Sequence, residues 1–154
     1  MQEKFTARFF EKIAESGKSH AEIADLLHIN VHDIIRWASG KNRYLASVEK
    51  MLLFANFFGC TVDFLLGLSD DDTADFVMIE EPKIAGRFKK IVYEERGFTF
   101  ARLSKETGIR NTTLFYNWDS GKAKPQIENL AKAARVGDFR RLSHRQREII
   151  SLFR

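Results

Sequence analysis

Two stretches decide the fold of this chain: Trp37-Ala38-Ser39-Gly40-Lys41 and Trp118-Asp119-Ser120-Gly121-Lys122. Each follows an apolar stretch with helical spacing. Gly17, upstream of the first stretch, matches Gly97 upstream of the second, 80 residues later. A repeat of this length predicts two similar compact domains in tandem, each with its own small core.

The composition favours an all-α protein. Leu, Ile, Ala, Lys and Glu recur at helical spacing, and proline occurs only at Pro82 and Pro125. No stretch shows the alternation that predicts a strand. With 154 residues, 44% of them hydrophobic, the chain is long enough for two small cores.

We expect five short helices in the first domain, residues 1–68. Phe5, Phe9 and Ile13, four residues apart, predict a first helix that ends near Gly17. Ser19 is a typical N-cap for the second helix. The other expected features are a turn at residues 28–30, a third helix at 31–38, a fourth that ends at Gly59 and a short fifth around residues 62–66.

The second domain, residues 84–154, is expected to repeat this plan. A first helix carries Phe88, Ile91 and Val92, and Thr99 caps the second. The other expected features are a tight turn at residues 108–109, a third helix at 112–119 and a fourth with Pro125 in its first turn.

Two features set the second domain apart. Ile29 matches Ile109 at an offset of 80 residues but the tryptophans match at 81, so one extra residue lies between Arg110 and Asn117. We expect it to rotate or lengthen the third helix. The chain ends in a different helix, capped by Ser143, whose apolar residues need a partner in this domain or in a second copy of the chain; they are Ile149, Ile150 and Phe153.

Charge divides the chain into three parts. Residues 1–67 carry eight basic and eight acidic side chains, residues 68–82 carry six acidic and none basic, and residues 83–154 carry 17 basic and seven acidic. We therefore expect an acidic linker at residues 69–83. The net charge of +10 in residues 83–154 gives only the second half of the chain the electrostatics of a nucleic-acid-binding protein.

Several classes of protein are not expected. Cys60 is the only cysteine, which excludes an internal disulfide or a cysteine-rich zinc site and fits a reducing cytoplasm. Residues 51–67 are interrupted by polar residues and glycine, so a membrane span is not expected, and the N-terminus does not resemble a signal peptide. His28 and His32 lack the further ligands of a metal site. No catalytic arrangement and no cofactor site is predicted, so an enzyme is not expected.

The repeated motif resembles the Cro and lambda-repressor type of helix-turn-helix, often called the XRE family. The resemblance covers nearly all of residues 1–68 and roughly residues 85–136. It rests on residues 58–67 in the first domain, and on residues 103–109 and 118–125 in the second. It implies two small helix-turn-helix domains in tandem, double-stranded DNA as partner, and a third helix of each domain that reads bases in the major groove.

The resemblance also implies which residues contact DNA. Base reading is implied for the residues that open the third helix and lie on its exposed face: Asn30, His32, Asp33 and Arg36 in the first domain, and Arg110, Asn111, Thr112, Thr113, Tyr116 and Asn117 in the second. Phosphate contacts are implied for Lys41, Asn42, Arg43, Lys122 and Lys124.

The chain also departs from the family. His28 stands where the family has a turn glycine, so the first turn is expected to be strained or differently shaped. His20 and Phe100 replace the glutamine that often begins the second helix, and the Phe100 side chain cannot donate a hydrogen bond. Asp33 would repel phosphate unless it accepts from a cytosine amine.

Three functions follow as alternatives. The first is a sequence-specific transcriptional regulator that binds DNA through both domains. In the second, only the second domain binds DNA and the first is a protein-interaction or dimerisation module. The third is an antitoxin-like protein whose main task is to bind another protein, suggested by the C-terminal helix, which could also join two chains as a homodimer.

Overall fold

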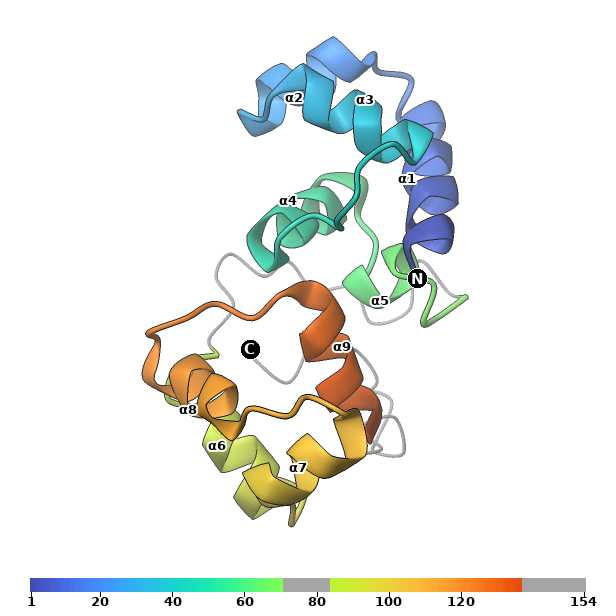
Figure 1. Ribbon diagram of the computed structural model, residues 1–154. Helices are drawn as coiled ribbons and strands as arrows, with labels where there is room; N and C mark the ends of the chain where they lie inside the picture. The colour runs from blue at the N-terminus through green and yellow to red at the C-terminus, as the bar shows by residue number, and fades with distance from the viewer. Residues whose placement is uncertain (71–83, 137–154) are drawn as a thin grey trace. The chain divides into compact units, whose positions relative to one another are not determined.

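The computed structural model describes residues 1–70 and 84–136, and all regular secondary structure in those ranges is helical (Figure 1). The expected all-α class is therefore confirmed. The chain divides into two compact units, Met1–Met78 and Ile79–Arg154. The expected C-terminal helix from Ser143 and most of the acidic linker lie outside the described residues. Within those ranges, no helix is long and apolar enough to cross a membrane.

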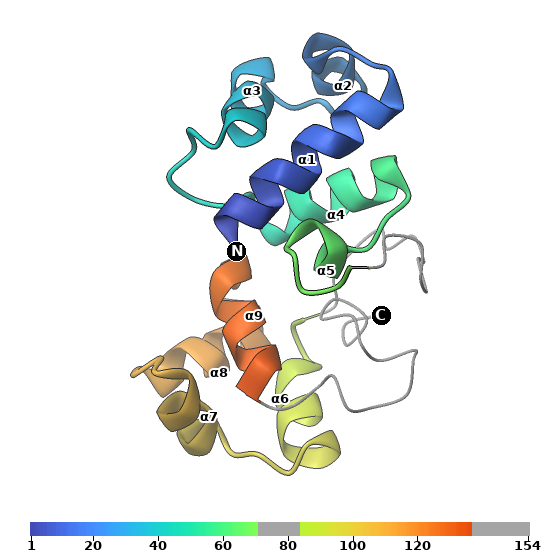
Figure 2. The same cartoon turned by 90° about the vertical axis from the view of Figure 1, so that its right-hand side faces the viewer.

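The first unit, which we call unit one, contains α1 (Gln2–Ser16), α2 (His20–Leu27), α3 (Val31–Ser39), α4 (Val48–Phe58) and α5 (Val62–Leu65). Ser19 caps α2 as expected, because its hydroxyl accepts a hydrogen bond from the Glu22 amide at 3.1 Å. Helix α1 packs against α3 and α5, and α2 packs against α3 (Figure 2).

An aromatic cluster fills the core of unit one. Phe9 stacks near Phe5 with ring centroids 5.2 Å apart and tilts against Phe54 at 4.8 Å. Trp37 meets Phe54 edge-on at 5.6 Å. All four side chains are buried, so the tryptophan of the repeated motif packs α3 against the core.

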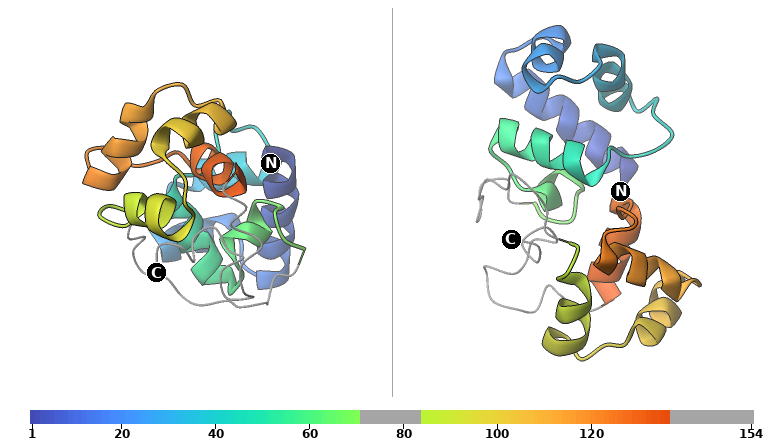
Figure 3. Two further views of the ribbon diagram at one scale, coloured as in Figure 1. Left: turned by 90° about the horizontal axis from the view of Figure 1, so that it is seen from below. Right: turned by 90° about the vertical axis from the view of Figure 1, so that its left-hand side faces the viewer.

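The second unit, unit two, contains α6 (Phe88–Lys90), the π-helical segment η1 (Ile91–Glu95), α7 (Phe100–Thr107), α8 (Thr112–Ser120) and α9 (Ile127–Val136). Helix α8 packs against α6 and α7, and α9 packs against α7 (Figure 3). Thr99 caps α7 as expected, by accepting from the Arg102 amide at 3.1 Å. Pro125 differs from expectation: it is buried in the loop and precedes α9 instead of lying in its first turn.

The π-helical segment was not expected from the sequence, and it holds one inserted residue. Phe88 occupies the place of Phe9 at an offset of 79 residues, whereas Gly97 matches Gly17 at 80. The extra residue is accommodated by a wider turn, in which the Arg96 amide donates to the Ile91 carbonyl at 3.1 Å, five residues back. The insertion places Tyr93 between α7 and α8, as its contacts below show.

The turns between the second and third helices differ in strain. His28 has φ 54° and ψ 43°, the left-handed conformation that Gly108 adopts at the matching position of unit two with φ 75°. Among the described residues it is the only non-glycine residue with positive φ. Of the two expected outcomes, strain in the turn after α2 is thus the one that His28 shows.

Replacing His28 by glycine should therefore stabilise unit one by about 0.5–1 kcal/mol, because glycine adopts this conformation without a Cβ clash. Hydrogen exchange of the α1 and α3 amides measures the gain. The reciprocal change, Gly108→His, should destabilise unit two by a similar amount. A loss of protection in His28→Gly would contradict the assignment of strain.

Candidate nucleic-acid interface

Helices α3 and α8 present the same four positions to solvent. In unit one these are His32, Ile35, Arg36 and Ser39, and all are exposed. In unit two the matching residues are Thr113, Tyr116, Asn117 and Ser120, of which Asn117 is half-buried. We call these the outer faces of α3 and α8. The sequence prediction missed Ile35, which is 42% exposed.

The extra residue of unit two lies in the turn. Asn30 and Asn111 cap α3 and α8 in the same way: each side-chain oxygen accepts from the amide two residues on, at 2.8 Å and 3.0 Å. Both helices have nine residues, so the expectation of a rotated or longer third helix is wrong. The insertion is Arg110, an exposed cation directly before the cap.

The capping role also limits what the two asparagines can do. Their side-chain oxygens are held by the backbone, so only the amide hydrogens remain as donors. Thr112 is half-buried, and Asp33 is half-buried with its carbonyl oxygen 3.4 Å from the Asn42 side-chain nitrogen. The residues expected to read bases at the start of each helix therefore take part in local hydrogen bonds or are half-buried.

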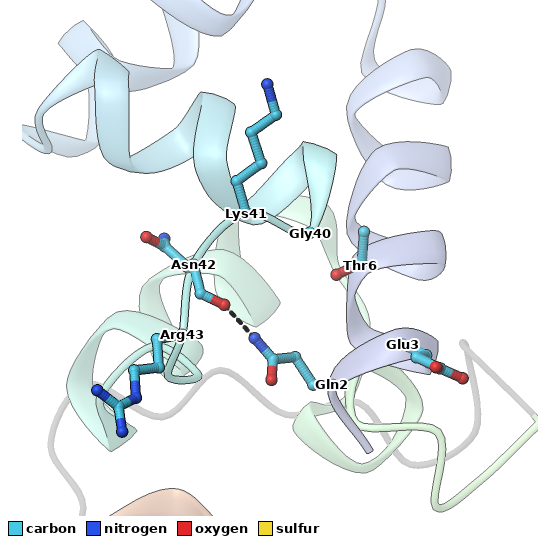
Figure 4. A pocket seen from close by; sticks show the side chains of 7 residues that line it. All are labelled: Gln2, Glu3, Thr6, Gly40, Lys41, Asn42 and Arg43. Atoms are coloured by element: carbon cyan, nitrogen blue, oxygen red, sulfur yellow. Dashed lines mark hydrogen bonds between the residues drawn. The ribbon is translucent and has the colours of Figure 1, made fainter.

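The loop after α3 holds the three residues expected to contact phosphate in unit one. Lys41, Asn42 and Arg43 line a pocket of about 540 Å³ together with Gln2 and Thr6 of α1. The Gln2 side chain donates to the Asn42 carbonyl, and Lys41 and Arg43 point in different directions (Figure 4). The two cations therefore do not converge on one group.

The loop after α8 is shorter. Lys122 and Lys124 are both exposed there. In unit one the Trp37 indole nitrogen donates to the Tyr44 carbonyl at 3.3 Å, whereas the buried Trp118 indole nitrogen has no hydrogen-bond partner among the described residues. The loop spans residues 121–126 instead of the 40–47 of unit one, which removes the matching carbonyl.

Asp119, the residue that differs between the two motifs, connects α8 to the start of α6. Its carboxylate accepts from the Lys89 amide at 2.9 Å, and its carbonyl accepts from the Gly86 amide at 2.7 Å. An acidic side chain at a helix N-terminus is favourable, so Asp119 braces α8 against the first helix of its own unit.

Phe100 explains one departure from the family. It is buried at the beginning of α7 and lies 5.7 Å from the rings of both Phe88 and Phe115. Position 100 thus belongs to the core of unit two. His20, its counterpart, is half-buried at the start of α2.

A polar aromatic cluster lies beside the outer face of α8. The Tyr93 hydroxyl accepts from the Phe100 amide at 3.1 Å, and it lies close enough to the Tyr116 hydroxyl to raise the pKa of Tyr116. The Lys89 ammonium lies 5.7 Å from the Tyr93 ring centroid and 5.8 Å from that of Tyr116. The sequence prediction missed Lys89 and Tyr93, because the π-helical turn that positions Tyr93 has no simple sequence signature.

Tyr93 raises the pKa of Tyr116, first because two phenolates so close would repel, then through their hydrogen bond and partial desolvation. A raised pKa means that the neutral tyrosine is the form favoured in the fold. The stability that this favoured neutral form contributes to folding is fully present below the ordinary tyrosine pKa of about 10. It is lost as the pH rises through the raised pKa of Tyr116.

Carbon-13 NMR titration of the tyrosine ring carbons should show this shift. We expect Tyr116 to ionise above its ordinary range, and Tyr93→Phe to bring its pKa back toward that range. An unaltered Tyr116 titration in Tyr93→Phe would contradict the hydroxyl pairing.

Charge is deployed differently in the two units. In unit one, the Arg8 guanidinium donates to the carbonyls of Phe64 and Ser69 and pairs with Asp70 at 2.7 Å. Lys12 is buried and pairs with Glu15 at 3.1 Å. Two of the eight basic side chains of unit one thus form contacts that stabilise its own fold. By contrast, residues 84–136 of unit two have an excess of positive charge, with 11 basic and five acidic residues.

The predicted DNA-contacting residues of each unit are thus brought together around one helix and the segments on either side of it. Within residues 1–70 and 84–136, no three His, Cys, Asp or Glu side chains are grouped as metal ligands. Comparison of the chain with protein-family models, with curated proteins and with solved structures finds no match.

Proposed function

We propose that this protein is a sequence-specific double-stranded-DNA-binding regulator and that unit two is its principal reader. The observation that carries the proposal is the outer face of α8, a capped helix on which Thr113 and Tyr116 are exposed and Asn117 is half-buried beside them. The major groove admits one α-helix, and amides and hydroxyls are groups that read base edges there.

Cations flank this face at both ends. Arg110 precedes α8 and Lys122 follows it, and both are exposed. Such side chains contact phosphates and fix the register of a reading helix on the duplex. By occupying promoter DNA, the protein would block or recruit polymerase, and no cofactor is needed for this action.

Selection from a random pool of duplexes by the full chain tests the proposal. We expect an enriched sequence motif and an affinity that falls steeply between 50 and 200 mM salt, because each released counterion adds to the slope. Absence of salt-sensitive binding to every duplex would contradict it.

A second candidate function concerns unit one. Leu26 is 55% exposed and Ile35 42% exposed, where unit two has Glu106 and Tyr116 at the matching positions. Apolar side chains exposed on α2 and α3, with the zero net charge of residues 1–67, favour a protein-interaction or dimerisation module. An antitoxin-like partner protein is a variant of the same idea.

The double variant Leu26→Glu, Ile35→Tyr gives unit one the residues of unit two and tests this candidate. It should reduce the solution mass if unit one dimerises, or abolish co-purification of a stoichiometric partner from the native host. A parent chain that is monomeric and partner-free would rule the candidate out.

A further inference from the structure

The outer face of α8 holds one large side chain, Tyr116, whose hydroxyl lies toward Tyr93. Tyr116 is 49% exposed, and the nearby Tyr93 hydroxyl raises its pKa. Its ring meets Phe100 edge-on, with centroids 4.8 Å apart and the planes at 85°. With the hydroxyl toward Tyr93 and the ring held against Phe100, the exposed part that Tyr116 offers to a ligand includes its apolar ring.

Tyr93 fixes this orientation from a second element. It stands on the π-helical segment, meets Phe100 edge-on at 5.1 Å and accepts from the Phe100 amide. Phe100 itself is buried. Tyr93 and Phe100 thus hold Tyr116 from two sides, which limits the rotamers that its ring can adopt.

Unit one has no such arrangement. Ile35 occupies the place of Tyr116, and the first helix of that unit lacks the inserted residue that forms the π-helical turn. The cluster is therefore a property of unit two alone.

In the major groove, the apolar group that distinguishes one base from another is the 5-methyl group of a pyrimidine. We propose that the Tyr116 ring reads a 5-methyl group, of thymine or of 5-methylcytosine, and that Tyr93 is the positioning residue for this contact. The inference rests on the proposed DNA-binding function and assigns to it one element of base specificity. Asn117, the next residue on the same face, offers an amide to an adjacent base.

The test uses the duplex selected by the full chain. Each thymine is replaced in turn by deoxyuridine, which removes only the methyl group. We expect one thymine at which the affinity falls about fourfold, the factor that corresponds to burial of one methyl group. At that position, 5-methylcytosine should bind more tightly than cytosine by a similar factor.

Variants assign the effect to the cluster. Tyr116→Ala should bind the thymine and deoxyuridine duplexes equally, while Tyr116→Phe should keep the difference because the hydroxyl does not face the base. Tyr93→Phe should reduce the difference and also lower the pKa of Tyr116, a pair of changes that a merely structural role would not produce. Tyr44→Ala, at an exposed tyrosine of unit one, is the matched control. It should change neither the discrimination between the thymine and deoxyuridine duplexes nor the pKa of Tyr116.

The outcomes separate this inference from the function on which it rests. If no duplex is bound in a salt-sensitive way, the proposed function fails. If DNA is bound but every thymine can be replaced by deoxyuridine without loss, or if Tyr116→Ala keeps the discrimination, the assignment to Tyr116 is overturned alone.

Discussion

Replacing Phe115 by alanine should unfold unit two while unit one stays folded. Phe115 is fully buried and lies 5.9 Å from Phe88, 5.7 Å from Phe100 and 5.3 Å from Trp118, centroid to centroid. Truncation of such a residue costs about 3–5 kcal/mol. A domain of this size has a stability near the low end of the usual range of about 5–15 kcal/mol, so little or none would remain.

Amide NMR spectra and hydrogen exchange measure this effect helix by helix. We expect protection to be lost in α6, α7, α8 and α9 and kept in α1, α3 and α4. Phe115→Leu, which conserves most of the volume, should cost less than about 1.5 kcal/mol and keep both units folded. Loss of protection in α1 and α3 as well would contradict the division into two independent cores.

The second large effect concerns DNA affinity. The double variant Arg110→Ala, Lys122→Ala removes the exposed cations before and after α8. The slope of the logarithm of affinity against the logarithm of salt concentration should fall by about two, one for each phosphate contact. At 0.1 M salt this corresponds to a loss of affinity of about 10- to 100-fold, similar for all sequences.

The loop of unit one supplies the control for this experiment. Lys41→Ala, Arg43→Ala removes the same charge from side chains that point apart around the pocket (Figure 4). We expect a change in slope of less than about one. An equal loss in both double variants would show that both units hold phosphate and would favour the two-reader hypothesis.

Much of the fold could be predicted from the repeat and its caps. The helix class, the caps Ser19 and Thr99 and the buried tryptophans of the motif follow from local patterns, because a cap or an apolar stripe depends on residues within one or two turns. The site was predicted less completely. Alignment of the two repeats located an insertion near Arg110 but predicted that it would change the third helix. The cap at Asn111 shows that the helix begins after the insertion, which therefore lies in the turn.

Features that depend on tertiary contacts were not predictable from the sequence. The π-helical turn at residues 91–95 keeps the apolar residues of the first helix in register despite one inserted residue. The sequence pattern alone predicts an ordinary helix there. The packing of Tyr93 and Tyr116 on the same Phe100 ring joins elements that are distant in sequence. The exposure of Ile35 likewise depends on how α3 packs against α1 and α2.

The most direct test of unit two as principal reader compares matched positions on the two outer faces. Thr113→Ala, Asn117→Ala changes the face of α8, and His32→Ala, Arg36→Ala changes the corresponding positions of α3. With the selected duplex, the unit-two variant should lose at least about 10-fold in affinity, as expected for lost base contacts, and the unit-one variant less than about twofold. A loss in the unit-one variant that equals or exceeds that of the unit-two variant would contradict the account.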